Sequence, residues 1–131
     1  MVKPRLLVYS CSGCSSAAQM ANQMALWLDR EGLAEMSCIA GVGGGVVGLQ
    51  KIAQSGRPIL ALDGCRLHCV SACLQQAGVA ADSHITLGDY GVRKKHHTDF
   101  ERHQAHTLYD TIVMPAVRAL QRSSAPVPRT D

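Results

Sequence analysis

The chain has 131 residues, of which 47% are hydrophobic and 18% charged, a composition typical of one globular domain and unlike that of disordered or membrane-embedded chains. The formal net charge of +3 is mild and aromatic residues make up only 4%, so nothing indicates the basic, aromatic-rich surface that binds nucleic acid. No apolar run approaches the ~20 residues of a transmembrane helix, and the run 6–10 is too short for a signal peptide. We therefore expect a cytoplasmic protein that binds neither nucleic acid nor membrane.

Short apolar runs alternate along the chain with stretches of helical periodicity. The predicted strands are residues 6–10, 36–40, 59–62 and 84–87. The predicted helices are residues 15–31, 46–55, 68–77 and 104–121, the last kinked or split by Pro115. The glycine-rich stretch 41–45 and the polar stretch 88–103 are predicted as loops.

This alternation predicts one α/β domain over residues 1–121, followed by a disordered tail over 122–131. We expect three layers, with a short, mainly parallel four-stranded sheet in the order 2-1-3-4 and helices on both faces. Right-handed crossovers would place every strand-to-helix turn at one edge of this sheet.

Two cysteine-bearing turns follow the first and third predicted strands. Cys11-x-x-Cys14 follows strand one and Cys65-x-x-x-Cys69 follows strand three, so adjacent strands would bring all four thiols to one point. These spacings suit a tetrahedral zinc site, and the thiols precede predicted helices whose N-terminal dipoles favour thiolate. The sequence therefore predicts a Zn²⁺ site with four cysteine ligands at the carboxyl ends of these strands.

The two remaining cysteines receive different predictions. Cys38 ends strand two near the glycine-rich loop and is a candidate fifth thiol, whereas Cys73 lies two helical turns beyond Cys65 and is expected in the core. Arg66 and residues 93–95 are candidate cations to balance four thiolates. The adjacent histidines at 96–97 lie on the same edge, where they would cap the site, move protons or simply face solvent.

Six cysteines in a reducing compartment favour metal binding or thiol chemistry over a disulfide framework. Besides zinc, two alternatives stay open. One is an iron–sulfur or thiol-dependent enzyme of sulfur transfer or redox chemistry, with three cysteines holding a cluster and one iron open to substrate. The other is a regulatory module in which metal reshapes the 88–103 loop for a protein partner; a homo-oligomer also stays open.

The order of these features resembles the DGC domain family, a group of small bacterial and archaeal proteins. The resemblance rests on Cys11-Ser12-Gly13-Cys14-Ser15, on the glycines of 41–45, and on the triplet Asp63-Gly64-Cys65 followed by Cys69. It covers residues 6–95 and extends loosely over the last helix. It implies that Cys11, Cys14, Cys65 and Cys69 chelate zinc, which in that family is an inference from the cysteine pattern.

Overall fold

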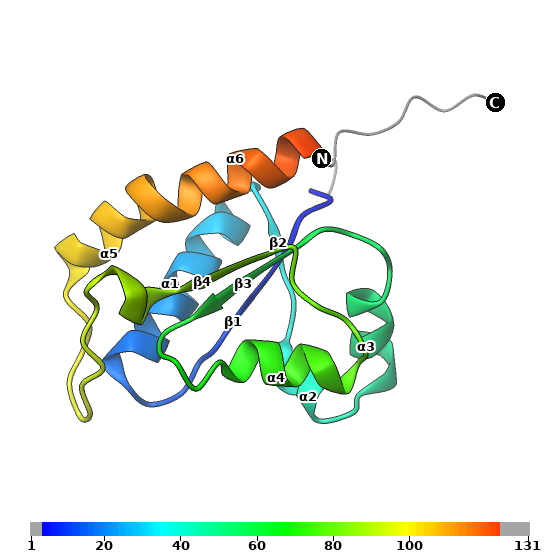
Figure 1. Cartoon of the computed structure of the whole chain (residues 1–131), viewed down its shortest axis with the longest axis horizontal. Coiled ribbons are helices and arrows are strands. Elements are labelled where there is room, and N and C mark those ends of the chain that lie inside the picture. Colours follow the sequence, from blue (N-terminus) through cyan, green and yellow to red (C-terminus); the bar gives the residue numbers. More distant parts are fainter. Residues whose placement is uncertain (1–3, 124–131) are drawn as a thin grey trace.

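The computed structural model describes residues 4–123 and confirms the predicted α/β class and sheet order (Figure 1). Four strands, all paired in parallel, form one sheet in the order β2-β1-β3-β4. Their bounds are Leu7–Ser10 for β1, Glu35–Met36 for β2, Ile59–Asp63 for β3 and Ser83–Thr86 for β4. Every residue of β1 and β3 is buried, which explains why both read as continuous apolar runs.

Helices cover both faces of the sheet, as predicted (Figure 1). The helical segments are α1 Ser16–Arg30, α2 Ile39–Gly43, α3 Val47–Ala53, α4 Cys69–Gln76, the 3₁₀ turn η1 Leu87–Tyr90, α5 Arg102–Leu108, the π-helical turn η2 Tyr109–Val113 and α6 Met114–Ser123. One core lies between the sheet and α1, α5 and α6, where Met24 and Leu28 pack near Leu60. The second lies under α2, α3 and α4, where Tyr9 packs near Leu74. The domain therefore has three layers.

The prediction for residues 36–45 was wrong. Strand β2 ends at Met36, and Ile39–Gly43 is a short helix instead of the end of a strand and a loop. A Cβ on Gly43 would lie 2.6 Å from Cys73 Sγ on α4, so glycine lets α2 pack closely against α4. Helix packing overrides the local strand signal here.

The last helix is interrupted, as the proline predicted. The π-helical turn Tyr109–Val113 directly precedes α6, in which Pro115 is the second residue. Proline supplies no backbone donor for the carbonyl four residues earlier, and a π turn at that point absorbs the irregularity. Helix α6 continues through Ser123, two residues into the expected tail; residues 124–131 lie outside the described residues.

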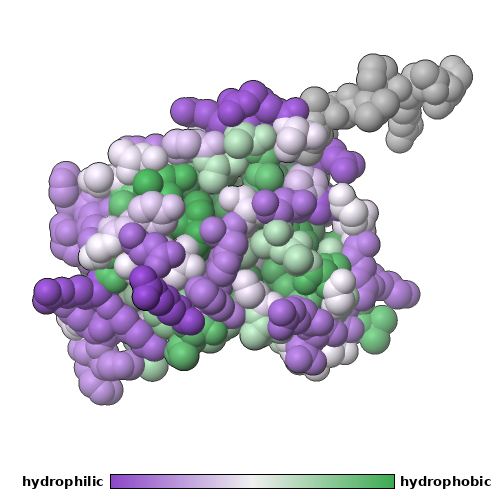
Figure 2. Space-filling model, viewed as in Figure 1, coloured by the Kyte–Doolittle hydropathy of each residue, from purple (hydrophilic) through white to green (hydrophobic). Residues whose placement is uncertain are grey.

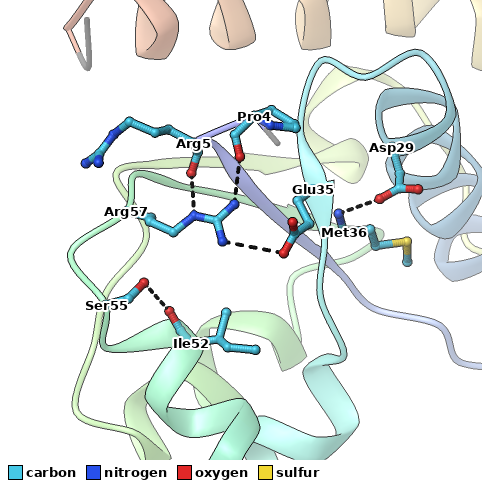
Figure 3. A network of polar contacts seen from close by, with 8 residues as sticks. All are labelled: Pro4, Arg5, Asp29, Glu35, Met36, Ile52, Ser55 and Arg57. Atoms are coloured by element: carbon cyan, nitrogen blue, oxygen red, sulfur yellow. Dashed lines mark hydrogen bonds and ion pairs between the residues drawn. The ribbon is translucent and has the colours of Figure 1, made fainter. Parts of the chain in front are cut away.

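Arg57 ties together the amino end of the sheet (Figure 3). Its guanidinium donates to the carbonyl oxygens of Pro4 at 2.7 Å and Arg5 at 2.8 Å, and lies 3.4 Å from the Glu35 carboxylate. Arg5 and Ser123 line a common cleft of about 440 Å³ at this end. The two ends of the described chain therefore lie together, at the edge of the sheet where the strands begin. No helix within residues 4–123 has the length and apolar character needed to cross a membrane.

Candidate thiol and metal site

Four cysteines from the two turns line one pocket of about 210 Å³ at the carboxyl ends of β1 and β3. They are the predicted set, Cys11, Cys14, Cys65 and Cys69. In Figure 1 the turn that leaves β1 and the turn that leaves β3 meet at this end of the sheet. The four thiols thus share a pocket, whereas their role as metal ligands stays a prediction.

Parallel pairing of β1 with β3 brings the two turns together. Ser10 is paired with Leu62, and the N–H of Cys11 extends the ladder by donating to the Leu62 carbonyl at 3.1 Å. The N–H of Gly64 then donates to Cys11 Sγ at 3.2 Å. This last bond joins the turns at a cysteine sulfur.

Gly64 allows the β3 turn to approach α1. A Cβ at this position would lie 2.5 Å from the carbonyl carbon of Ala17, which is backbone and cannot swing aside. Any side chain here would separate the two cysteine turns. The glycine between Asp63 and Cys65 is therefore a packing requirement of the pocket.

Asp63 holds the start of α4 and hence Cys69, the first residue of that helix. Its buried carboxylate accepts from the N–H of Val70 at 3.0 Å and lies 2.8 Å from His84 Nε2 on β4. Asp63 thereby caps α4, while the N-cap residue itself, His68, adopts a left-handed φ of 55° and makes no side-chain cap. The pairing with His84 was not predicted, because nothing in the sequence links strand four to Asp63.

The 91–101 loop supplies the polar side of the pocket. Lys94 Nζ lies 3.6 Å from Cys65 Sγ, and His96 lines the same pocket. Among the other cations predicted to balance the thiols, Arg66 instead pairs with Asp89 at the surface, 3.3 Å away. His97 is not among the residues that line the pocket.

Ser16, in the first turn of α1, holds this loop in place. Its N–H donates to the Lys95 carbonyl at 2.9 Å, its hydroxyl accepts from the Lys95 N–H at 3.0 Å, and the hydroxyl lies 3.3 Å from the carbonyl of Arg93. These bonds bracket Lys94, whose amine lies near Cys65 Sγ. No feature of the sequence singled out Ser16.

The two other cysteines lie away from the pocket lining. Cys38 is exposed just before α2 and is not among the residues that line the pocket, so its role as a fifth thiol stays a prediction. Cys73 packs against Gly43, and burial raises the pKa of its thiol. Cys73 was expected in the core and is half-buried, so that prediction is confirmed in part.

Burial dominates the electrostatics of Cys11. It raises the pKa of this thiol from its ordinary value of 9.0 to about 11, although the Gly64 N–H acts in the opposite direction. Asp63, Cys69 and Cys65 add smaller contributions that also raise it. Cys11 therefore keeps its proton at neutral pH in this structure.

Comparison with known proteins identifies the family. The DGC domain model matches residues 7–112. The chain belongs to the DGC family. A second DGC-containing chain, from Pseudomonas aeruginosa and named anaerobic and virulence modulator AnvM, is 57% identical over 106 residues, which cover 81% of each chain. No solved structure matches.

In this DGC protein the naming triplet has one physical task per residue. Asp63 caps α4, Gly64 permits the close approach to α1, and Cys65 lines the pocket. The donor set of four thiols suits zinc or an iron–sulfur cluster, and the Gly64 N–H and the Lys94 amine both lie where they would stabilise bound thiolates. Within residues 4–123, however, no three His, Cys, Asp or Glu side chains already stand in a metal-binding arrangement. The four thiols therefore suit a metal by residue type and by their shared pocket, whereas their side chains do not stand in a metal-binding arrangement in this structure.

Proposed function

We propose that this protein is a small cytoplasmic regulatory protein whose pocket binds Zn²⁺ through Cys11, Cys14, Cys65 and Cys69. The observation that carries the proposal is the shared pocket, in which two turns 54 residues apart in the sequence, counted from Cys11 to Cys65, contribute two thiols each. Zinc with four cysteine ligands is a closed structural arrangement that leaves no open position for substrate. A regulatory role is supported by the name of the Pseudomonas relative, which is called a modulator.

The chain's own residues would prepare the pocket for the ion. Four thiolates around Zn²⁺ leave a net charge of about −2, and Lys94 lies beside one of the four sulfurs. Loading would release the proton that burial keeps on Cys11 and tighten the turns around Gly64. Because Ser16 links the start of α1 to the 91–101 loop, such tightening would also change the conformation of that loop.

Metal analysis of protein purified anaerobically without added metal tests this proposal. We expect about one zinc per chain, lost in Cys11→Ser and Cys65→Ser and retained in Cys38→Ser and Cys73→Ser, as a site with four cysteine ligands requires. The last two are matched controls, since each removes one thiol that does not line the pocket. Zinc that survives both pocket substitutions would refute the assignment.

An iron–sulfur cluster is the second candidate. Six cysteines exceed the need of one zinc ion, and the name of the relative refers to anaerobic conditions, under which oxygen-labile clusters persist. Brown protein with labile sulfide and a visible absorption band would favour a cluster over zinc. Substitution of Cys11 or Cys65 should then abolish the colour. If colourless, metal-free protein instead reacted rapidly with a thiol reagent at Cys14, which is exposed, a thiol-dependent reaction would lead.

A further inference from the structure

A second cavity, larger than the thiol pocket, lies on the other side of the 91–101 loop. We call it the α1–α5 cleft; it has a volume of about 760 Å³ and is bounded by α1, the loop and α5. Figure 2 shows hydrophilic side chains gathered over this loop and the start of α5. A volume of this size is typical of sites that bind a small organic molecule.

The cleft combines an apolar floor with charged edges. Met20 and Val92 are buried beneath it, and Phe100 and Leu108 are half-buried along it. The charged residues that line it are Arg93, Lys95, Asp99 and Glu101, all exposed. Within residues 4–123 none of these four takes part in an ion pair, so their charged groups are available to a ligand.

Residues 93–96 form a wall shared by the two cavities. Arg93 and Lys95 line the α1–α5 cleft, whereas Lys94 and His96 line the thiol pocket. Successive side chains of this extended segment therefore face opposite sides. Within the described chain, the backbone hydrogen bonds of residues 93–100 are those made with Ser16, which holds the wall at Arg93 and at Lys95.

We propose that the α1–α5 cleft binds a small organic acid with an apolar body and a single negative charge, and that binding shifts the shared wall and changes the reactivity of the thiols. The acid group pairs with Arg93 and Lys95, while the apolar body covers Met20 and Phe100. Asp99 and Glu101, on the same cleft, disfavour multiply charged anions. Because Arg93, Lys94 and Lys95 are consecutive, a backbone shift of Arg93 or Lys95 toward the ligand also moves Lys94 relative to Cys65. Neither step needs a metal in the thiol pocket.

Binding is tested with 1-naphthoate, which has an aromatic body and one carboxylate, added to the metal-free full chain under reducing conditions. Amide chemical shifts in a two-dimensional NMR titration should change saturably over residues 91–104. Replacing the carboxylate with a hydroxymethyl group, in 1-naphthalenemethanol, should weaken binding about tenfold or more, as expected for losing one charge-assisted pairing. Equal binding of both compounds, or shifts elsewhere only, overturns the site.

Four variants, one of them a control, locate the ligand. Arg93→Glu and Lys95→Glu should each weaken naphthoate binding about tenfold, whereas Lys51→Glu, the same charge change at an exposed position on α3, should not. Thr107→Trp should fill the cleft from α5 and should abolish binding. All four positions are exposed, so each variant should retain its fold, which circular dichroism checks. Binding that survives Thr107→Trp overturns the proposal.

Coupling is measured as the rate at which iodoacetamide alkylates Cys65, followed by mass spectrometry with and without saturating 1-naphthoate. The rate should change about fivefold, a typical size for coupling between two sites. It should not change in Thr107→Trp, where Lys94 and Cys65 are intact but the cleft is filled. A rate that naphthoate leaves unaltered in the unsubstituted chain, despite saturable binding in the cleft, overturns the coupling.

Discussion

At Gly64 the β3 turn passes so close to the first turn of α1 that an added Cβ would meet the backbone of Ala17 at 2.5 Å. A flexible side chain could give way, but backbone can only shift with its helix. We therefore expect Gly64→Ala to lower the free energy of unfolding by about 1–3 kcal/mol, the usual cost of overpacking, as measured by urea denaturation.

Gly48 provides the matched control for this substitution. It lies inside α3, and a Cβ there would meet nothing within 4 Å. Gly48→Ala should raise the free energy of unfolding by about 1 kcal/mol, because alanine has the higher helix propensity. A loss of stability at Gly48 similar to that at Gly64 would contradict the packing argument.

The raised pKa of Cys11 predicts how the stability of the metal-free protein depends on pH. The folded chain keeps the Cys11 proton up to about pH 11, whereas the unfolded chain releases it near the ordinary value of 9.0. The corresponding stabilisation is fully present below pH 9.0 and is lost as the pH rises through about 11. The urea midpoint should fall over this interval, and by less in Cys11→Ala; identical pH profiles for the two proteins would contradict the shift.

At the scale of elements, α4 begins where it does because Asp63 accepts the N–H of Val70. Asp63→Ala removes this cap and leaves buried groups without their acceptor, so it should cost about 2 kcal/mol or more. Asp63→Asn keeps an acceptor oxygen and should cost less. Asp89→Ala, which removes a surface pairing with Arg66, should change urea stability by less than about 1 kcal/mol.

The 91–101 loop depends on Ser16 in the same way. Ser16→Ala removes two of the three hydrogen bonds that hold residues 93–95, while the bond from the Ser16 N–H remains. Trypsin should then cleave after residues 93–95 about tenfold faster, because local opening becomes less costly. Ser12→Ala is the control, since the Ser12 hydroxyl makes no hydrogen bond within residues 4–123. Equal cleavage of both variants would show that Ser16 does not hold the loop.

Sequence periodicity predicted most elements because most of them follow local patterns. The buried run 59–62 and the three-and-four spacing of Ala17, Met20 and Met24 predicted β3 and α1. The pattern failed at residues 36–40, where apolar residues before a glycine run resemble a strand. What decides that segment is close packing of Gly43 on Cys73, a contact between residues 30 positions apart.

At the scale of the whole molecule, the thiol pocket could be predicted because topology alone determines it. Once β1 and β3 are neighbours in a parallel sheet, Cys11 and Cys65 must leave it at the same edge. The polar contacts around the pocket could not be predicted from topology. Contacts of Asp63 with His84, and of Ser16 with the loop, depend on side-chain directions across elements that periodicity does not encode.

If the pocket binds zinc, the ion should stabilise the fold as a whole, since it would link the turn after β1 to the turn after β3. Free zinc at a thousandfold excess over its dissociation constant should raise the free energy of unfolding by about 4 kcal/mol, and a chelator should reverse this. Cys38→Ser should show the full increase and Cys65→Ser little of it. An equal increase in both variants would place the ion elsewhere.

The cleft shared by Arg5 and Ser123 has a practical consequence for anything attached to the protein. Both residues lie at the edge of the sheet where the strands begin, and the cysteine turns lie where β1 and β3 end. A fluorophore or surface linker joined at Ser123 would therefore lie at the end of the molecule opposite the cysteine turns. Immobilised in this orientation, the protein would present its sulfur-bearing end to the solution, where metal ions, small acids or a second protein can be offered to it one at a time.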